Sequence, residues 1–209
     1  MADVNPDRSA RRPTLRDERA QVTRRRIADA GRRLFLRDGY AATTLAGIAT
    51  DAGVAVQTVY AVYGSKAGIL GALRESAMTQ PEAEALYGQA MAEPSPQRRL
   101  ELFAGSIRRR WEFSGDVVKI DRDAGTADPA IRAGVSATLE RRRAGIAALA
   151  VALGNHLRPG VDVERATAVL DALTLPDVYA ELVGVHRWTS DAYEAWLAAA
   201  LVHELLSPG

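Results

Sequence analysis

The fold is decided by residues 43–66, which read TTLAGIATDAGVAVQTVYAVYGSK. Four apolar residues in this stretch recur at the i, i+3, i+4 and i+7 spacing of a single helix face: Leu45, Ile48, Ala49 and Ala52. Thr43 and Thr44 precede this helix as N-cap residues, and Gly53 ends it after barely two turns. A second short helix is expected over residues 55–63, before Gly64. The pattern predicts two short helices joined by a tight glycine turn.

This geometry suits the insertion of the second helix into a DNA major groove about 12 Å wide. Ala55, Val59 and Tyr63 are spaced to face the core. The remaining face of the helix is left to point outward, with Val56, Gln57, Tyr60 and Ala61 on it. Apolar residues on a solvated face suit contact with thymine methyl groups, and a glutamine pairs with adenine N6 and N7.

Other residues around this helix are expected to contact the DNA backbone. Thr58 and Tyr60 carry hydroxyl groups suited to phosphate oxygens. Lys66 supplies a charge at the N-terminus of the next helix. We therefore expect a DNA-binding surface formed by Thr44, Val56, Gln57, Thr58, Tyr60, Ala61, Lys66 and Arg25.

Upstream of the motif, Val22, Ile27, Leu34 and Phe35 predict a helix that stops at Gly39. Residues 1–20 are polar, contain two prolines and are predicted to be a flexible basic arm. The arm arginines suit a minor groove or a solvated tail, and the solvated tail is favoured. For Arg24–Arg26 a solvated helix face and phosphate contact are both open. The head is assigned to residues 21–66.

Downstream, the chain is predicted to be helical almost throughout, so the fold class is all-α. Helices are expected over residues 97–113, 115–125, 129–156, 163–184 and 190–206. No alternating strand pattern occurs. Residues 67–209 are assigned to one helical domain for effector binding and dimerisation.

Composition narrows the class of protein. The 209 residues contain no cysteine, which excludes disulfides and cysteine-based zinc sites. No apolar run is long enough for a membrane helix, so we expect a cytoplasmic protein with no membrane partner. Residues 1–75 carry a net charge of +5 and residues 76–209 a net charge of −4. A basic N-terminal part followed by an acidic remainder is expected when only the N-terminal part binds a polyanion.

Residues 22–75 resemble the N-terminal signature of the tetracycline-repressor (TetR) family. The match rests on the stretch from Thr43 to Lys66, which aligns without a gap, and on Ile27–Tyr40, which resembles the family's first helix. Leu175–Tyr179, Trp188 and Tyr193–Leu197 also resemble members of the family, more weakly. The family commonly has His then Phe where Val62 and Tyr63 stand here. The resemblance implies a dimer whose effector changes the separation of two DNA-binding heads and releases the operator.

The last two helices are the expected dimer contact, on the apolar residues Val169, Ala172, Leu173, Trp196, Leu197, Ala200 and Leu201. Aromatic and polar residues of the middle helices are expected to line an effector cavity: Phe103, Arg110, Trp111, Asp121, Asn155 and Tyr179. Such a lining suits a small hydrophobic or aromatic effector. The triplets Arg108–Arg110 and Arg141–Arg143 are expected to be mostly solvated.

Three classes of function are weighed. The first is a ligand-responsive transcriptional repressor, with an activator of the same fold as its variant. The second is a helical enzyme with an added DNA-binding head, but no nucleophile elbow, phosphate loop or acidic triad occurs. The third is a DNA-binding protein without an effector. We expect no catalytic residue, no cofactor and no metal site, since the three histidines are scattered.

Overall fold

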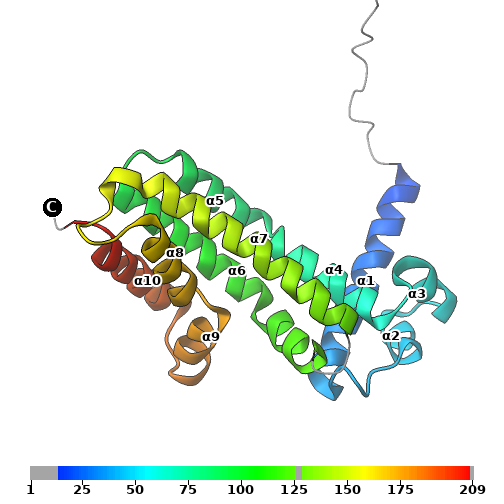
Figure 1. Ribbon diagram of the computed structural model, residues 1–209. Coiled ribbons are helices and arrows are strands. Elements are labelled where there is room, and N and C mark those ends of the chain that lie inside the picture. Colours follow the sequence, from blue (N-terminus) through cyan, green and yellow to red (C-terminus); the bar gives the residue numbers. More distant parts are fainter. Residues whose placement is uncertain (1–13, 126–128, 208–209) are drawn as a thin grey trace, which may run out of the picture.

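The computed structural model describes residues 14–125 and 129–207 and is built of helices (Figure 1). Within those ranges the nearest approach to a strand is one isolated bridge between Leu157 and Leu206. The predicted all-α class is therefore confirmed. The α-helices are α1 (Leu15–Asp38), α2 (Leu45–Ala52), α3 (Val56–Tyr63), α4 (Lys66–Met78), α5 (Pro81–Ala92), α6 (Pro96–Gly125), α7 (Pro129–Leu153), α8 (Val163–Leu173), α9 (Pro176–Tyr179) and α10 (Ser190–Leu205).

The head consists of α1, α2 and α3, turned as the glycine pattern predicts. Gly53 adopts a left-handed conformation, with φ of 63°, that glycine reaches without strain. Its N–H donates to the Ala49 and Thr50 carbonyls, and the Val54 N–H also donates to Ala49. Among the described residues, no single helix is long and apolar enough to cross a membrane; α2 and α3 meet that criterion only as a pair bent by 107°.

Two hydrophobic cores form along the molecule. The first joins the head to α4, to the last turns of α6 through Val117, Ile120 and Ala124, and to α7 through Ile131. The second joins α5, the first half of α6, the second half of α7, α8 and α10. Figure 1 shows α6 and α7 running along the molecule between the head at one end and α10 at the other. Helices α6 and α7 therefore each belong to both cores.

The second core contains residues that were expected at a dimer contact. Leu197 and Leu201 are fully buried, on the side of α10 that packs in this core. That expectation is wrong for these two residues, because the i, i+4 stripe they share with Tyr193 and Leu205 faces the monomer interior.

The Tyr193 hydroxyl is buried without a hydrogen-bond partner among the described residues, and its burial raises the pKa of this phenol.

Helix boundaries differ from the expected ones in two places. The first helix begins at Leu15 because Thr14 and Asp17 form a capping box, so residues 15–20 are helical rather than part of an arm. Residues 1–13 of the expected arm lie outside the described residues. In α6 the expected break near residue 114 is absent. The Ser114 hydroxyl instead donates to the Arg110 carbonyl, and the helix continues to Gly125.

The helix expected over residues 163–184 is also interrupted. Helix α8 ends at Leu173, and Leu175 is extended, as a residue before proline must be to avoid a clash. Pro176 then opens α9, which passes into a π-helical turn over Ala180–Val185. The helix expected to reach residue 156 ends at Leu153, followed by one 3₁₀ turn.

Candidate DNA-binding head and effector cavity

Helix α3 lies with one side on the head core and the other side in solvent. Val59 is fully buried and fixes this orientation. Gln57, Tyr60 and Ala61 are exposed, as predicted for a helix that reads base edges, and Tyr60 is 55% exposed despite its aromatic ring. The helix therefore presents a polar amide, a phenol and a methyl group on one free face.

The two ends of α3 depart from the predicted facing. Val56 is half-buried and packs against the head core rather than pointing outward, whereas Ala55, predicted to face the core, is exposed. Since Ala55 is the N-cap, its side chain precedes the helix and does not follow the helical spacing. Tyr63 is half-buried, and its hydroxyl donates to the Arg24 carbonyl at 3.0 Å. Burial raises the pKa of this phenol.

The three consecutive arginines of α1, Arg24–Arg26, have different roles. Arg24 lies over the Tyr63 ring at 5.5 Å and Arg26 donates to the Gly53 carbonyl, so both brace the turn and α3. Arg25 is exposed and has no partner in the part of the chain that the structure describes. Its exposure leaves Arg25 available to a phosphate group.

The two threonines of the expected surface differ. Thr44 is exposed and caps α2 by accepting the Gly47 N–H at 3.0 Å. Thr58 is half-buried.

Lys66 has another role than the expected phosphate contact. Its ammonium donates to the Tyr40 carbonyl at 2.7 Å and to the Ala41 carbonyl at 3.2 Å, and it lies 4.7 Å from the centre of the Tyr40 ring. These contacts join the start of α4 to the loop between α1 and α2. Because the ammonium is turned toward the protein, we replace the expected phosphate contact with a structural one.

An apolar cavity of about 440 Å³ lies where the two cores meet. Its walls come from the C-terminal half of α4, the C-terminal half of α6, the first half of α7 and the residues after α8. Three expected effector residues line it: Arg110, Trp111 and Asp121. The Trp111 indole N–H donates to the Thr174 carbonyl at 3.2 Å, which fixes the ring as a wall.

A second cavity of about 280 Å³ adjoins the first and contains the expected residue Phe103. Met78, Arg110 and Arg142 line both cavities. Tyr87 lines the smaller one and donates to the Gly145 carbonyl, and burial raises the pKa of its phenol. The two spaces thus share one wall, which contains two arginines.

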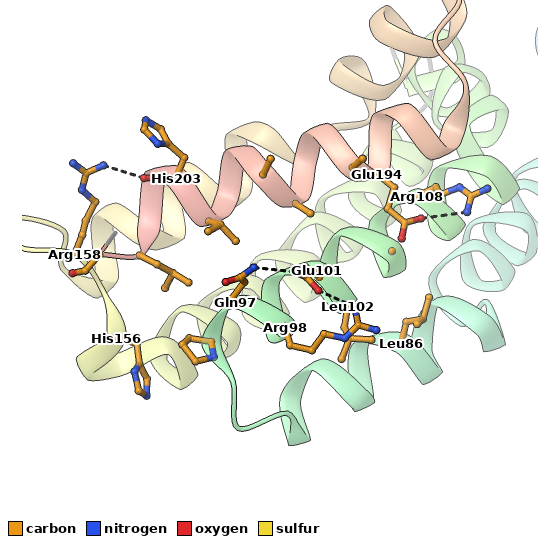
Figure 2. Close-up of a pocket in the computed structure, with 18 of the residues that line it drawn as sticks. Leu86, Gln97, Arg98, Glu101, Leu102, Arg108, His156, Arg158, Glu194 and His203 are labelled. Carbon is orange, nitrogen blue, oxygen red and sulfur yellow. Dashed lines mark hydrogen bonds and ion pairs between the residues drawn. The ribbon is translucent and has the colours of Figure 1, made fainter. Parts of the chain in front are cut away.

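Two expected effector residues lie elsewhere. Tyr179 packs edge-on against Tyr193 and bonds to the Ser190 hydroxyl at 2.9 Å. Asn155 lines an open groove between α6 and α10. Figure 2 shows this groove, with the neighbouring His156 labelled. The charged groups of that groove pair with one another, as Arg98 does with Glu101 and Arg108 with Glu194. These two residues are therefore separate from the cavity between the cores.

Sequence reasoning missed several residues of the cavity. Arg142 was expected to be solvated with its triplet, yet its side chain is only 10% exposed and is bonded to Asp171 and Thr174. Val135, Thr138 and Leu139 line the cavity from the same face of α7. Counted from Val135, these residues and Arg142 follow the i, i+3, i+4 and i+7 spacing of one helix face, which was the available signal.

Helix α4 is tied to the body by charged contacts. Arg74 forms a buried bidentate ion pair with Asp121 at 2.5 and 2.8 Å. Glu75 accepts from Arg141, and this hydrogen bonding lowers the pKa of the Glu75 carboxyl. Arg110 donates to the Met78 carbonyl at 2.7 Å. The end of α4 is therefore held by groups that line or border the cavity.

Comparison with known proteins identifies the architecture. The model of bacterial regulatory proteins of the tetR family matches residues 27–73. The chain is 31% identical over 198 residues to a probable HTH-type transcriptional regulator, ArpR, of Pseudomonas putida, covering 82% of this chain and 90% of ArpR. It is 30% identical over the same length to the HTH-type transcriptional regulator TtgR of the same species, with the same coverage. The chain belongs to the TetR family.

Solved TetR-family structures have the same fold. SmeT, solved in complex with triclosan, superimposes with a TM-score of 0.73 at 19% identity, covering 90% of this chain and 94% of SmeT. NalD, the secondary repressor of the MexAB-OprM multidrug efflux pump in Pseudomonas aeruginosa, has a TM-score of 0.70 at 22% identity, covering 92% and 100%. Family membership, shown by the family model and the two curated relatives, makes the chain a DNA-binding transcriptional regulator rather than an enzyme.

The first prediction concerns Lys66. Lys66→Met removes two charge-assisted hydrogen bonds to carbonyl groups, so unfolding free energy is expected to fall by about 1–3 kcal/mol. Binding to all DNA sequences is expected to weaken similarly as the head loosens, while the slope of affinity against salt stays unchanged. Thermal melts and DNA titrations at several salt concentrations measure both effects. Lys119→Met, at an exposed site on α6, is the control. If the slope of DNA affinity against salt concentration fell by about one per subunit, Lys66 would contact a phosphate group as first predicted.

Proposed function

We propose that this TetR-family protein is a dimeric repressor released from its operator by a small hydrophobic or aromatic effector. The observation that carries the proposal is the position of the 440 Å³ cavity at the junction of the two cores, against the end of α4. A protein without an effector has no need of an apolar cavity there. Because it acts on DNA, we place it in the cytoplasm.

Helix α4 is the natural link between the cavity and the head. It starts at Lys66, three residues after α3 ends, and its last turns supply Arg74, Ala77 and Met78 to the cavity wall. A filled cavity changes the space available to these turns. Since Ile69 and Leu70 at the other end pack in the head core, a shift of α4 alters the position of α3.

The relatives support the same function. NalD is described as a repressor of a multidrug efflux pump, and SmeT was solved with triclosan. Of these two proteins of the same fold, one is named as a repressor and the other was bound to a small aromatic molecule. We propose that the chain works in the same general way, on an operator of its own.

Gln57 is the residue that we expect to read bases. Gln57→Ala removes a bidentate contact to adenine, which is expected to cost about 1–3 kcal/mol on the preferred site and little on random DNA. The preferred site is first selected from random DNA, and competition binding then compares the two. Gln89→Ala, at an exposed position of α5, is the control. Equal losses on both DNAs would make Gln57 a phosphate contact or a bystander.

We place the dimer contact on the outer faces of α8 and α10. With Leu197 and Leu201 buried inside the monomer, the outward residues of α10 include Ala195 and Ala199, and those of α8 include Ala168 and Ala172. Trp196, Ala200, Val169 and Leu173 border them, half-buried. Small residues let two helix pairs approach closely, as a symmetric four-helix contact requires.

Sedimentation velocity tests this contact. Ala199→Glu places a charge at the centre of the proposed interface without entering the monomer core, and is expected to give a folded monomer. Ala137→Glu, an exposed alanine of α7, is the matched control and is expected to remain dimeric. If Ala199→Glu also remained dimeric, the interface would lie on another face.

Reciprocal binding tests the effector cavity, with triclosan as the probe. A ligand that weakens operator binding must itself bind more weakly in the presence of operator, by the same factor. Leu139→Trp narrows the cavity and is expected to reduce triclosan affinity by roughly tenfold or more, since a filled space leaves no room for the ring. Val151→Trp, an exposed site on the same helix, is the control. Equal triclosan affinity with and without operator would contradict the proposed release mechanism.

A further inference from the structure

The cavity between the two cores has an excess of positive charge. Five arginines and two aspartates line it. Both carboxylate oxygens of Asp121 are bonded to Arg74, and Asp177 is paired with Arg122 near the surface. The acidic groups are therefore already neutralised, while three arginines have no acidic partner within the lining: Arg110, Arg132 and Arg142.

Arg142 has an unused donor. Its side chain is 10% exposed; one terminal nitrogen bonds to the Asp171 carboxylate, and the other donates to the Asp171 carbonyl and to the Thr174 hydroxyl. Three of its five N–H groups are thus used, and Nε–H is buried without a hydrogen-bond partner among the described residues. A charged group with donors left over is stabilised by a further acceptor, which a ligand oxygen at the shared wall supplies.

Arg142 lies on the wall that the two cavities share. Arg110 lies on the same wall and donates to the Met78 carbonyl at the end of α4 and to Glu84 at 2.9 Å. An anionic group placed there meets two guanidinium groups at once. It also meets the arginine that holds the last residue of α4.

The entrance of the cavity carries the third arginine. Arg132 lines the larger cavity, is exposed and has no partner in the described part of the chain. An exposed cation beside an apolar cavity raises the local concentration of anions. Positive charges thus lie both at the exposed side of the cavity, on Arg132, and at the shared wall, on Arg110 and Arg142.

We infer that the effector is an amphipathic organic anion. Its ring system lies against the apolar residues of the 440 Å³ cavity, such as Trp111, Val117 and Val135, and its carboxylate or similar group faces the guanidinium groups of Arg110 and Arg142 at the shared wall. The excess of arginines over aspartates in this lining disfavours a cationic effector, and a neutral hydrocarbon would supply no acceptor to these arginines. This inference rests on the proposed effector function and adds the charge of the ligand.

Two probes of nearly equal shape test the charge. 1-Naphthoate and 1-naphthamide share the two-ring body, and only the first is anionic at neutral pH. Titration calorimetry on the full chain is expected to give roughly tenfold tighter binding for naphthoate, because charge-assisted hydrogen bonds are about twice as strong as neutral ones. Raising the salt concentration is expected to narrow that difference.

Variants identify the arginine that favours the anionic naphthoate over the neutral naphthamide. Arg142→Met is expected to remove the preference for naphthoate and to leave naphthamide affinity within about twofold. Arg143→Met, the exposed neighbour that lines neither cavity, is expected to keep the preference. If Arg142→Met fails to fold, Arg132→Met at the exposed rim is expected to weaken naphthoate binding at low salt only.

The wild-type comparison alone is able to overturn the inference. Equal affinity of the two probes, or binding of neither by a protein that still binds DNA, would contradict it. So would a preference that survives in Arg142→Met. Each of these results is distinct from a failure of the effector function itself, which is measured by the linkage between ligand and operator.

Discussion

The ion pair between Arg74 and Asp121 is the contact on which the arrangement of the two cores depends. Both side chains are about nine-tenths buried, and both oxygens of the carboxylate are used. Loss of one partner would leave an uncompensated charge in the interior, at a cost of about 3–5 kcal/mol. The pair joins α4 to α6 at the wall of the cavity, where apolar packing is interrupted. It therefore fixes the position of one helix against the other at the point where packing alone does not.

Two further arginines, Arg32 and Arg141, also form ion pairs that join one helix to another. Arg32 of the head forms a bidentate pair with Asp116 of α6, also donates to the Phe113 carbonyl and lies over the Phe113 ring. Glu75 and Arg141 link α4 to α7. Directional contacts thus connect α1, α4, α6 and α7 around the space between the cores. Such contacts have few alternative geometries, so a displacement at the cavity is transmitted as a shift of whole helices rather than absorbed locally.

The sequence was sufficient to predict what local spacing determines. The turn at Gly53 and the buried position of Val59 follow from the apolar pattern of residues 45–63, and the structure confirms both. The role of Lys66 was not predictable in this way, because its partners Tyr40 and Ala41 lie about 25 residues earlier in the chain. Arg142 is a similar case: spacing within α7 places it on the face of Val135 and Leu139, but its bonds to Asp171 and Thr174 are long-range contacts that local spacing does not reveal. Local rules predicted the elements, and long-range contacts determined the function of the charged residues.

The same contacts explain how the chain tolerates a cavity. An empty apolar space lacks the dispersion contacts that fill an ordinary core, so a cavity of several hundred cubic ångströms lowers stability. The cavity between the cores is bordered by Trp111, whose ring is fixed by Thr174, and by Arg142, which bonds to the same threonine. These hydrogen bonds hold the walls apart and prevent their collapse onto each other. A site of this kind is weakly packed but well defined, which favours a ligand that supplies the missing contacts and changes the position of α4 as it does so.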